Sequence, residues 1–211
     1  MNYNFINKIN GWIVFSIATI VYLLTIEDTA SLWDCGEYIT AAYKLEVGHP
    51  PGAPLYMILG RVFSFFAAPE NVALFINALS ALSSSFTILF MFWSITLLLK
   101  KLILQSKKSL ENHDKIGIFV SASIGSLAYT FTDSFWFSAV EGEVYAMASL
   151  FTAIIFWAIL KWDEEISDLQ SNNLSNNINP NRWLLLIMFL LGLAIGVHLL
   201  GILVIPAIGY V

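Results

Sequence analysis

The chain has 211 residues, of which 58% are hydrophobic and only 12% are charged, and its formal net charge is −5. About a quarter of the residues in a soluble globular domain are charged, so this composition excludes that class and indicates an integral membrane protein. A membrane-spanning helix needs about 20 residues, which leaves room for one bundle and no sizeable soluble domain. We expect residues 1–211 to form a single all-α transmembrane domain with the lipid bilayer, and no nucleic acid, as a partner.

Five long apolar runs along the chain predict five membrane-spanning helices. A sixth run, Leu55 to Ala68, is short and carries Arg61 in its middle, so we expect it to lie as a helix in the membrane interface. The five runs are Gly11 to Ile26, Val72 to Leu99, Ile116 to Phe131, Val144 to Trp162 and Trp183 to about Ile205.

The basic residues predict the orientation of these helices, because Lys and Arg in short loops are retained on the cytoplasmic side. If Leu55 to Ala68 does not cross the membrane, eight of the ten basic residues fall inside. They are Lys8, Lys100, Lys101, Lys107, Lys108, Lys115, Lys161 and Arg182. Residues 27–71 and 132–143 then share the exterior face, where most of the acidic residues gather.

The remaining segments carry little chemistry. Residues 163–181 are rich in Asn and Ser and are expected to form a cytoplasmic linker. The single cysteine, Cys35, allows no internal disulfide. The last residues, GILVIPAIGYV, end inside an apolar run, and we expect the chain to be the N-terminal part of a longer protein.

Two acids, Asp34 and Glu37, stand three residues apart in the stretch WDCGEYITAAYKL. If this stretch is helical, both carboxylates project from one face. Two neighbouring carboxyls raise each other's proton affinity, and this is one way to obtain a general base at neutral pH. The alternative is a solvated helix end, where acids near the N-terminus are common.

The run GHPPGAP follows directly and contains His49. Its prolines lack backbone donors and favour extended geometry, whereas its glycines permit turns. We expect a stiff loop that ends one helix and starts another. His49 is then either a contact for an anionic group or a simple turn cap.

Two further exterior positions carry ionisable residues. Glu141 and Glu143 flank Gly142 between the third and fourth spans, where such residues are functional candidates or acids that reach toward water. His198 lies about fifteen residues into the fifth predicted span, in LGLAIGVHLLGILVIP, and is expected to face the bundle interior or a polar cavity. Glycine-rich phosphate loops, zinc-binding spacings and a D-x-D pair are missing from the sequence, so we expect no metal and no cofactor.

The segments LWDCGEYITAAYKLEVGHPPGAPLYMILGRVFS, AVEGEVYAMASLF and LGLAIGVHLLGILVIPA together resemble the DUF2723 family of protein O-mannosyltransferase-like membrane proteins, found in Bacteroidota and, as a relative, in animals. The resemblance covers nearly the whole chain. It implies a GT-C-like helical fold with an acidic first exterior loop and a total length much greater than this chain. Protein O-mannosyltransferases carry adjacent acids followed by His-Pro-Pro. Here the acids are Asp34 and Glu37, so which of them is the base stays open, with Asp34 favoured.

The resemblance implies an inverting transfer of a sugar, plausibly mannose, from a polyprenyl-phosphate donor to a Ser or Thr hydroxyl of an exported protein. It also implies the bacterial inner membrane, with the active face periplasmic. Two alternatives are an ion-coupled transporter and a non-catalytic membrane subunit. The expected substrate-binding residues are His49, Arg61, Glu141, Glu143 and His198, beside the catalytic pair Asp34 and Glu37.

Overall fold

The computed structural model describes residues 2–170 and 180–210, and this part of the chain is helical without any strand. The all-α prediction is therefore confirmed. The elements are α1 (Tyr3–Leu24), α2 (Cys35–Lys44), α3 (Pro54–Ser64), η1 (Pro69–Asn71), α4 (Val72–Ser106), α5 (Asn112–Thr130), α6 (Asp133–Val140), α7 (Val144–Gln170), α8 (Asn181–Ile195), η2 (Leu199–Val204) and α9 (Ile205–Tyr210).

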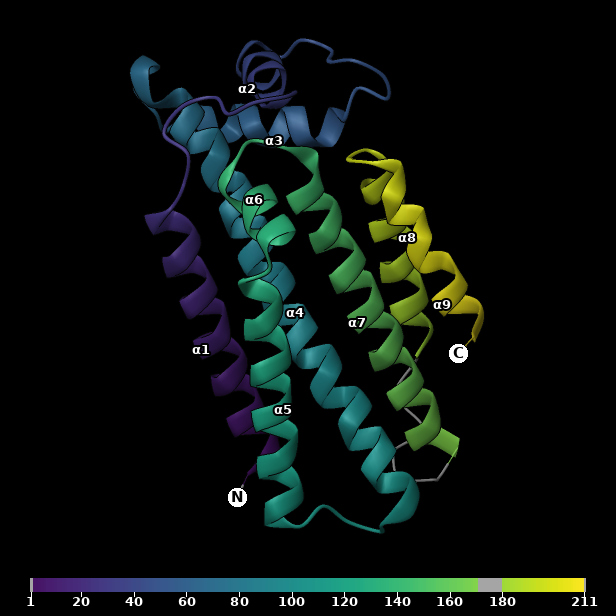
Figure 1. Cartoon of the computed structure of the whole chain (residues 1–211). Helices are drawn as coiled ribbons and strands as arrows, with labels where there is room; N and C mark the ends of the chain where they lie inside the picture. The colour runs from purple at the N-terminus through teal and green to yellow at the C-terminus, as the bar shows by residue number, and fades with distance from the viewer. Residues whose placement is uncertain (1, 171–179, 211) are drawn as a thin grey trace.

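The long helices form a bundle around α4, which contacts α1, α5 and α7 (Figure 1). The N-terminus and the α4–α5 loop lie at one end of the bundle. Helices α2 and α3 lie at the opposite end, with α3 across the ends of the long helices (Figure 1). Because α3 has only 11 residues, it fits the predicted interfacial helix rather than a span.

Three helical segments are long and apolar enough to cross a membrane: Tyr3–Leu24, Pro69–Ser106 and Val144–Leu169. They correspond to three of the five predicted spans. Helix α5 has 19 residues and runs beside them in the bundle (Figure 1), but it does not reach the apolarity of the other three. Its crossing stays a prediction.

The fifth predicted span is wrong in its extent. Helix α8 has only 15 residues and ends at Ile195, with Gly196 as its C-cap. His198 follows in extended conformation and caps η2, because its ring accepts a hydrogen bond from the backbone N–H of Leu200. A Cβ atom at Gly201 would lie 2.6 Å from the Ala194 Cβ, so only glycine allows η2 to fold back this closely onto α8.

Small residues let the central helices approach each other closely, as is usual at helix interfaces in membranes. Ala18 of α1 and Ala81 of α4 are fully buried in one cluster with Phe92. A Cβ atom at Gly11 would lie 2.5 Å from Nε1 of Trp93. The bundle core therefore depends on small side chains beside large aromatic ones.

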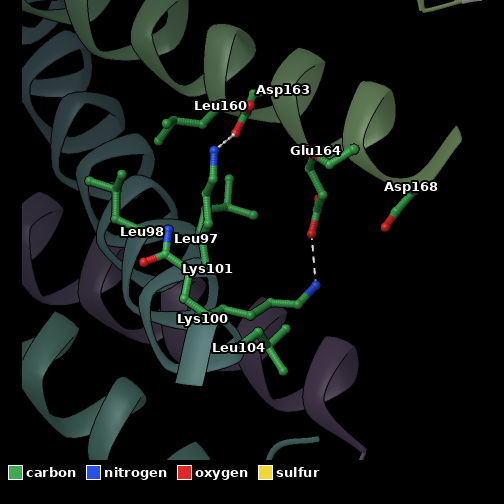
Figure 2. A pocket seen from close by; sticks show the side chains of 11 residues that line it. Leu97, Leu98, Lys100, Lys101, Leu104, Leu160, Asp163, Glu164 and Asp168 are labelled. Atoms are coloured by element: carbon green, nitrogen blue, oxygen red, sulfur yellow. Dashed lines mark hydrogen bonds and ion pairs between the residues drawn. The ribbon is translucent and has the colours of Figure 1, made fainter. Parts of the chain in front are cut away.

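Ion pairs join α4 and α7 at the lysine-rich end of the bundle. Lys100 Nζ lies 2.7 Å from Glu164 Oε1, and Lys101 pairs with Asp163 (Figure 2). These acids belong to α7, which continues to Gln170. The predicted linker of residues 163–181 is therefore wrong in its first part, since the Asp-Glu-Glu run is helical, with Asp163 and Glu164 paired to lysines and Glu165 to Arg182. Residues 171–179 lie outside the described residues.

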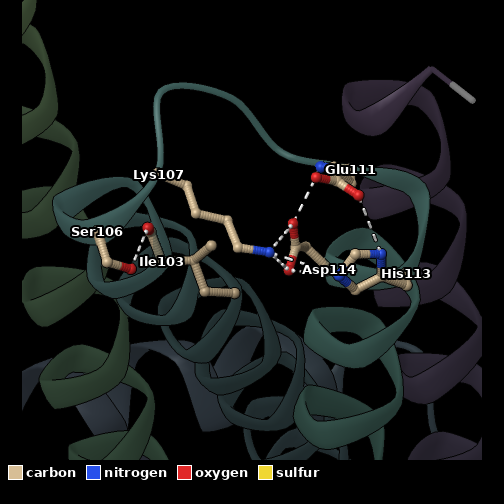
Figure 3. A network of polar contacts seen from close by, with 6 residues as sticks. All are labelled: Ile103, Ser106, Lys107, Glu111, His113 and Asp114. Carbon is tan, nitrogen blue, oxygen red and sulfur yellow. Dashed lines mark hydrogen bonds and ion pairs between the residues drawn. The ribbon is translucent and has the colours of Figure 1, made fainter.

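The α4–α5 loop is closed by its own polar network (Figure 3). Lys107 Nζ donates to both oxygens of Asp114, at 2.8 and 3.0 Å. Asp114 also accepts from the backbone N–H of Glu111, completing a capping box at the start of α5. The loop that turns α4 into α5 is thus fixed at the end of the bundle opposite α2 and α3.

Candidate functional site

Helix α2 presents Asp34 and Glu37 away from the bundle. Its inner face is buried, with Cys35 and Ala42 fully enclosed in the cluster that α2 shares with α3, α4 and α7. Asp34 stands at the N-cap, yet its side chain makes no capping hydrogen bond. Its carboxylate is 58% exposed and is therefore available to an external group, as a simple capping residue would not be.

His49 connects the proline-rich loop to α2 through Glu37. The backbone N–H of His49 donates to Glu37 Oε1 at 2.6 Å, and His49 Nδ1 lies 3.2 Å from Oε2. These contacts, the backbone hydrogen bond first, lower the pKa of Glu37. The other ring nitrogen, Nε2, lies 4.0 Å from Asp34 Oδ2. The predicted trio is thus brought together, with His49 between the two acids.

The same trio has a spacing that a metal ion could bridge. Asp34, Glu37 and His49 each offer one ligand atom, and these atoms lie within 4.8 Å of one another. Carboxylate oxygens and imidazole nitrogen suit several divalent cations. All three side chains are exposed, and His49 already bonds to Glu37 without a cation. The expected independence from metal stays a prediction.

The turn of Glu141, Gly142 and Glu143 lies against α4. The backbone N–H of Glu143 donates to the Glu141 carbonyl at 3.0 Å, and the Ser80 hydroxyl approaches the Glu143 carbonyl at 3.4 Å. A Cβ atom at Gly142 would meet Asn77 Oδ1 at 2.7 Å. The turn therefore packs too tightly on α4 for any side chain at position 142.

Hydrogen bonds hold the first exterior loop against this turn. Asn77 Nδ2 donates to the carbonyls of Glu27 at 2.7 Å and Thr29 at 3.0 Å. The backbone N–H of Glu27 donates to the Val140 carbonyl at 3.0 Å, and the Ser31 hydroxyl donates to Glu141. The two predicted exterior segments thus lie at the same end of the bundle.

Glu141 and Glu143 are the buried charged residues within the described parts of the chain. Burial raises the pKa of Glu143 to about 7, and the charges of Glu141 and Asp34 add to this effect while His49 opposes it. Burial also raises the pKa of Glu141, whereas its hydrogen bond from Ser31 lowers it. Glu143 therefore lies within the electrostatic field of the Asp34 and His49 cluster.

Comparison with known proteins matches most of the chain to one family. The pattern described as "Protein O-mannosyl-transferase TMEM260 N-terminal domain" matches residues 34–211. The chain belongs to this family. The match begins at Asp34 and contains every candidate site residue. The predicted resemblance to protein O-mannosyltransferases is confirmed at this level, whereas membership of DUF2723 stays a prediction.

Two curated relatives of this TMEM260-type domain carry the same name. The protein O-mannosyl-transferase tmem260 of Dictyostelium discoideum is 28% identical over 148 residues, and that of Mus musculus is 24% identical over 151 residues. The aligned regions cover 69% and 72% of this chain but only 16% and 19% of the two relatives. The chain thus spans a small part of their length. No solved structure matches it.

One residue beside the candidate site was not predicted from the sequence. Tyr38 lies on α2 directly after Glu37, and its ring centroid is 5.6 Å from that of His49. Burial raises the pKa of Tyr38 to about 12, followed by the charges of Glu143 and Asp34. A tyrosine in an amphipathic helix is usually a packing residue, and only the fold shows that Tyr38 contacts His49.

The two remaining predicted binding residues are placed differently. The His198 ring lies 5.5 Å from the Tyr145 ring. Tyr145 is two residues after Glu143 in the sequence, so His198 reaches only the edge of the site. The guanidinium of Arg61 donates to the Tyr43 carbonyl and lies over the Phe65 ring, 4.7 Å from its centroid. These contacts hold it beside α2 and α3 rather than against the acids.

Proposed function

We propose that this chain forms the membrane part of a protein O-mannosyltransferase, which moves mannose from a polyprenyl-phosphate donor to a Ser or Thr hydroxyl of an exported protein. The family match supports the reaction. The observation that carries the proposal is the gathering of Asp34, Glu37, His49 and Glu143 at one end of a bundle of apolar helices. A lipid-linked sugar reaches such a bundle at the membrane surface.

Asp34 is the general base in this proposal. It accepts the proton of the acceptor hydroxyl while the hydroxyl oxygen bonds to the anomeric carbon and the bond from that carbon to the phosphate oxygen breaks. Attack from the side opposite the phosphate inverts the configuration. Asp34 suits this role because its exposed carboxylate is not used for capping. Glu37, in contrast, is held by His49.

The departing phosphate needs a cationic or donor group. His49 is the best placed of the three predicted candidates, since its Nε2 lies 4.0 Å from Asp34 Oδ2. His198 stands farther out, behind Tyr145. Arg61 would have to leave Tyr43 and Phe65 to take part. We therefore assign the phosphate first to His49, with Glu141 and Glu143 nearer the sugar.

The reaction takes place on the exterior face in this proposal. The lysine-rich α4–α5 loop lies at the end of the bundle opposite α2 and α3 (Figure 1), and basic loops are retained inside the cell. The resemblance to bacterial proteins would place the enzyme in the inner membrane with a periplasmic site. A transporter would carry ionisable residues near mid-membrane, whereas the buried acids of the described chain stand in the turn before α7.

The test is transfer of labelled mannose from polyprenyl-phosphate mannose to a Ser/Thr peptide by the purified full-length protein. We expect transfer by the wild type and by Glu46→Gln, a control at an exposed acid just beyond α2. We expect severe loss for Asp34→Asn. A wild-type protein that binds the donor but transfers no mannose would contradict the proposed function.

A further inference from the structure

The acid cluster offers a sugar many acceptors and few donors. Ionised carboxylates only accept hydrogen bonds, and the carboxylates of Asp34 and Glu37 lie 4.0 and 3.2 Å from the ring nitrogens of His49. The pKa of Glu143 is raised to about 7, so this carboxyl is only partly ionised at neutral pH. The backbone N–H and Nδ1 of His49 are directed toward Glu37, and Nε2 is the atom proposed for the phosphate. Sugar hydroxyls can donate to the acids, but a ring oxygen can only accept. A site that binds the ring oxygen of a sugar is therefore served by a donor whose proton does not titrate near pH 7.

Tyr38 has the properties of such a donor. Its ring is 6% exposed and is held between the rings of His49 and Tyr56, each with a centroid 5.6 Å away. No residue in the described parts of the chain hydrogen-bonds to its hydroxyl. The position of the ring is thus fixed, while residues 2–170 and 180–210 offer the hydroxyl no hydrogen-bond partner.

Burial, followed by the surrounding charges, keeps the Tyr38 hydroxyl protonated. Its pKa is raised to about 12 by burial and then by Glu143, Asp34, Tyr145 and Glu37. Of these acids, Glu143 belongs to the turn before α7, and Glu37 belongs to α2 itself. The charges of acids from both segments thus act on the Tyr38 hydroxyl, which remains a donor at neutral pH.

We propose that the Tyr38 hydroxyl donates a hydrogen bond to an oxygen of the transferred sugar and so helps the site to select that sugar. This assignment rests on the proposed function, because it takes the donor to be a polyprenyl-phosphate sugar. The phosphate is already assigned to His49, whereas the neutral hydroxyl of Tyr38 suits an oxygen of the uncharged sugar. Tyr38 is thus assigned to the sugar and not to the phosphate.

The chain offers a matched pair of variants to test this. Tyr38→Phe removes one hydroxyl and keeps the ring between His49 and Tyr56. Tyr56→Phe removes one hydroxyl from the neighbouring ring, which is fully buried beneath the Gly142 turn. Both changes keep the aromatic packing of α2 on α3, so a difference between them reports on the Tyr38 hydroxyl.

The measurement is the Kd of the full-length protein for two probes, polyprenyl-phosphate mannose and polyprenyl phosphate. Losing one hydrogen bond of about 1 to 1.5 kcal/mol weakens binding roughly 5- to 12-fold. We expect this loss for Tyr38→Phe with the mannose-bearing probe, no change with polyprenyl phosphate, and wild-type values for Tyr56→Phe with both. Transfer assays on the same samples should show a raised KM for the donor.

Three outcomes would overturn the assignment. Equal losses for both probes would move Tyr38 to the phosphate, and unchanged binding of the mannose-bearing probe would leave its hydroxyl without a role in binding. A wild type that does not bind the mannose-bearing probe would also exclude it. A wild type that binds this probe without transferring mannose contradicts only the proposed function, since the comparison of Tyr38→Phe with wild type still applies.

Discussion

Glu37 holds His49 at two points, through the backbone N–H at 2.6 Å and through ring Nδ1 at 3.2 Å. The two residues are twelve apart in sequence, and the contact fixes the proline-rich loop to α2. The same contacts lower the pKa of Glu37, and a lowered pKa makes a carboxylate a weaker base. Glu37 is therefore better suited to orient His49 than to remove a proton.

This arrangement predicts different results for the two acids. Asp34→Asn keeps the shape but removes proton affinity, so we expect mannose transfer to fall about 10²- to 10⁴-fold with donor binding changed far less. Glu37→Gln should cost much less, because its amide oxygen can still accept from the His49 backbone. Transfer rates and donor Kd values of both variants provide the check. Near-normal transfer by Asp34→Asn, with an inactive Glu37→Gln, would move the base to Glu37.

The buried carboxyl of Glu143 predicts a pH-dependent stability. Its pKa is raised to about 7 in the folded protein by burial, Glu141 and Asp34, against an ordinary glutamate pKa of 4.5. The folded state therefore binds more protons than the unfolded state between these values, and stability falls as the pH rises from about 4.5 to 7. Each pKa unit corresponds to about 1.4 kcal/mol, so the loss is of the order of 3 kcal/mol.

Replacing Glu143 by Gln should remove this loss. We expect the Tm of Glu143→Gln in detergent to exceed that of the wild type at pH 8 and to differ little from it at pH 4.5. Glu46→Gln, at an exposed acid, serves as the control and should follow the wild type. If the Tm of Glu143→Gln changed with pH as that of the wild type does, the Glu143 carboxyl would not be the cause of the pH-dependent stability.

The long apolar runs allowed the main helices to be predicted, because their hydrophobic residues have few other places to lie. The helical stretch after Asp34 and the loop around His49 also agreed with the sequence. His198 was misplaced because an apolar run does not reveal that Gly196 ends a helix and Gly201 lets the chain fold back. Tyr38 was missed because its contact with His49, and the nearby charge of Glu143, arise only when the chain folds.

Asn77 of α4 is another residue whose contacts could not be predicted from the sequence. In sequence it is one polar residue in the long apolar helix α4, without any pattern that marks it. In the structure it is fully buried and donates to the carbonyls of Glu27 and Thr29. Such a contact joins residues about fifty apart, and no local periodicity predicts it.

The tight packing of Gly142 predicts a sensitive position. A Cβ atom there would lie 2.7 Å from Asn77 Oδ1 and 3.0 Å from a side-chain carbon of Ile39, so Gly142→Ala must displace the turn or α4. We expect a lower Tm and reduced transfer. Gly117→Ala on α5 is the control, since a Cβ atom there meets nothing within 4 Å and alanine favours helix by about 1 kcal/mol. A Gly142→Ala protein as stable as Gly117→Ala would contradict the packing.

The orientation of the bundle can be tested with single cysteines. Val47, beside the site, is 89% exposed, and Lys108 lies in the exposed loop at the opposite end. The native Cys35 is fully buried, so the wild-type protein should give little background labelling. Because basic loops stay inside, an impermeant thiol reagent should label Val47→Cys in intact cells but reach Lys108→Cys only after permeabilisation. The reverse pattern would place the acid cluster on the cytoplasmic face, where an exported acceptor protein could not be modified after translocation.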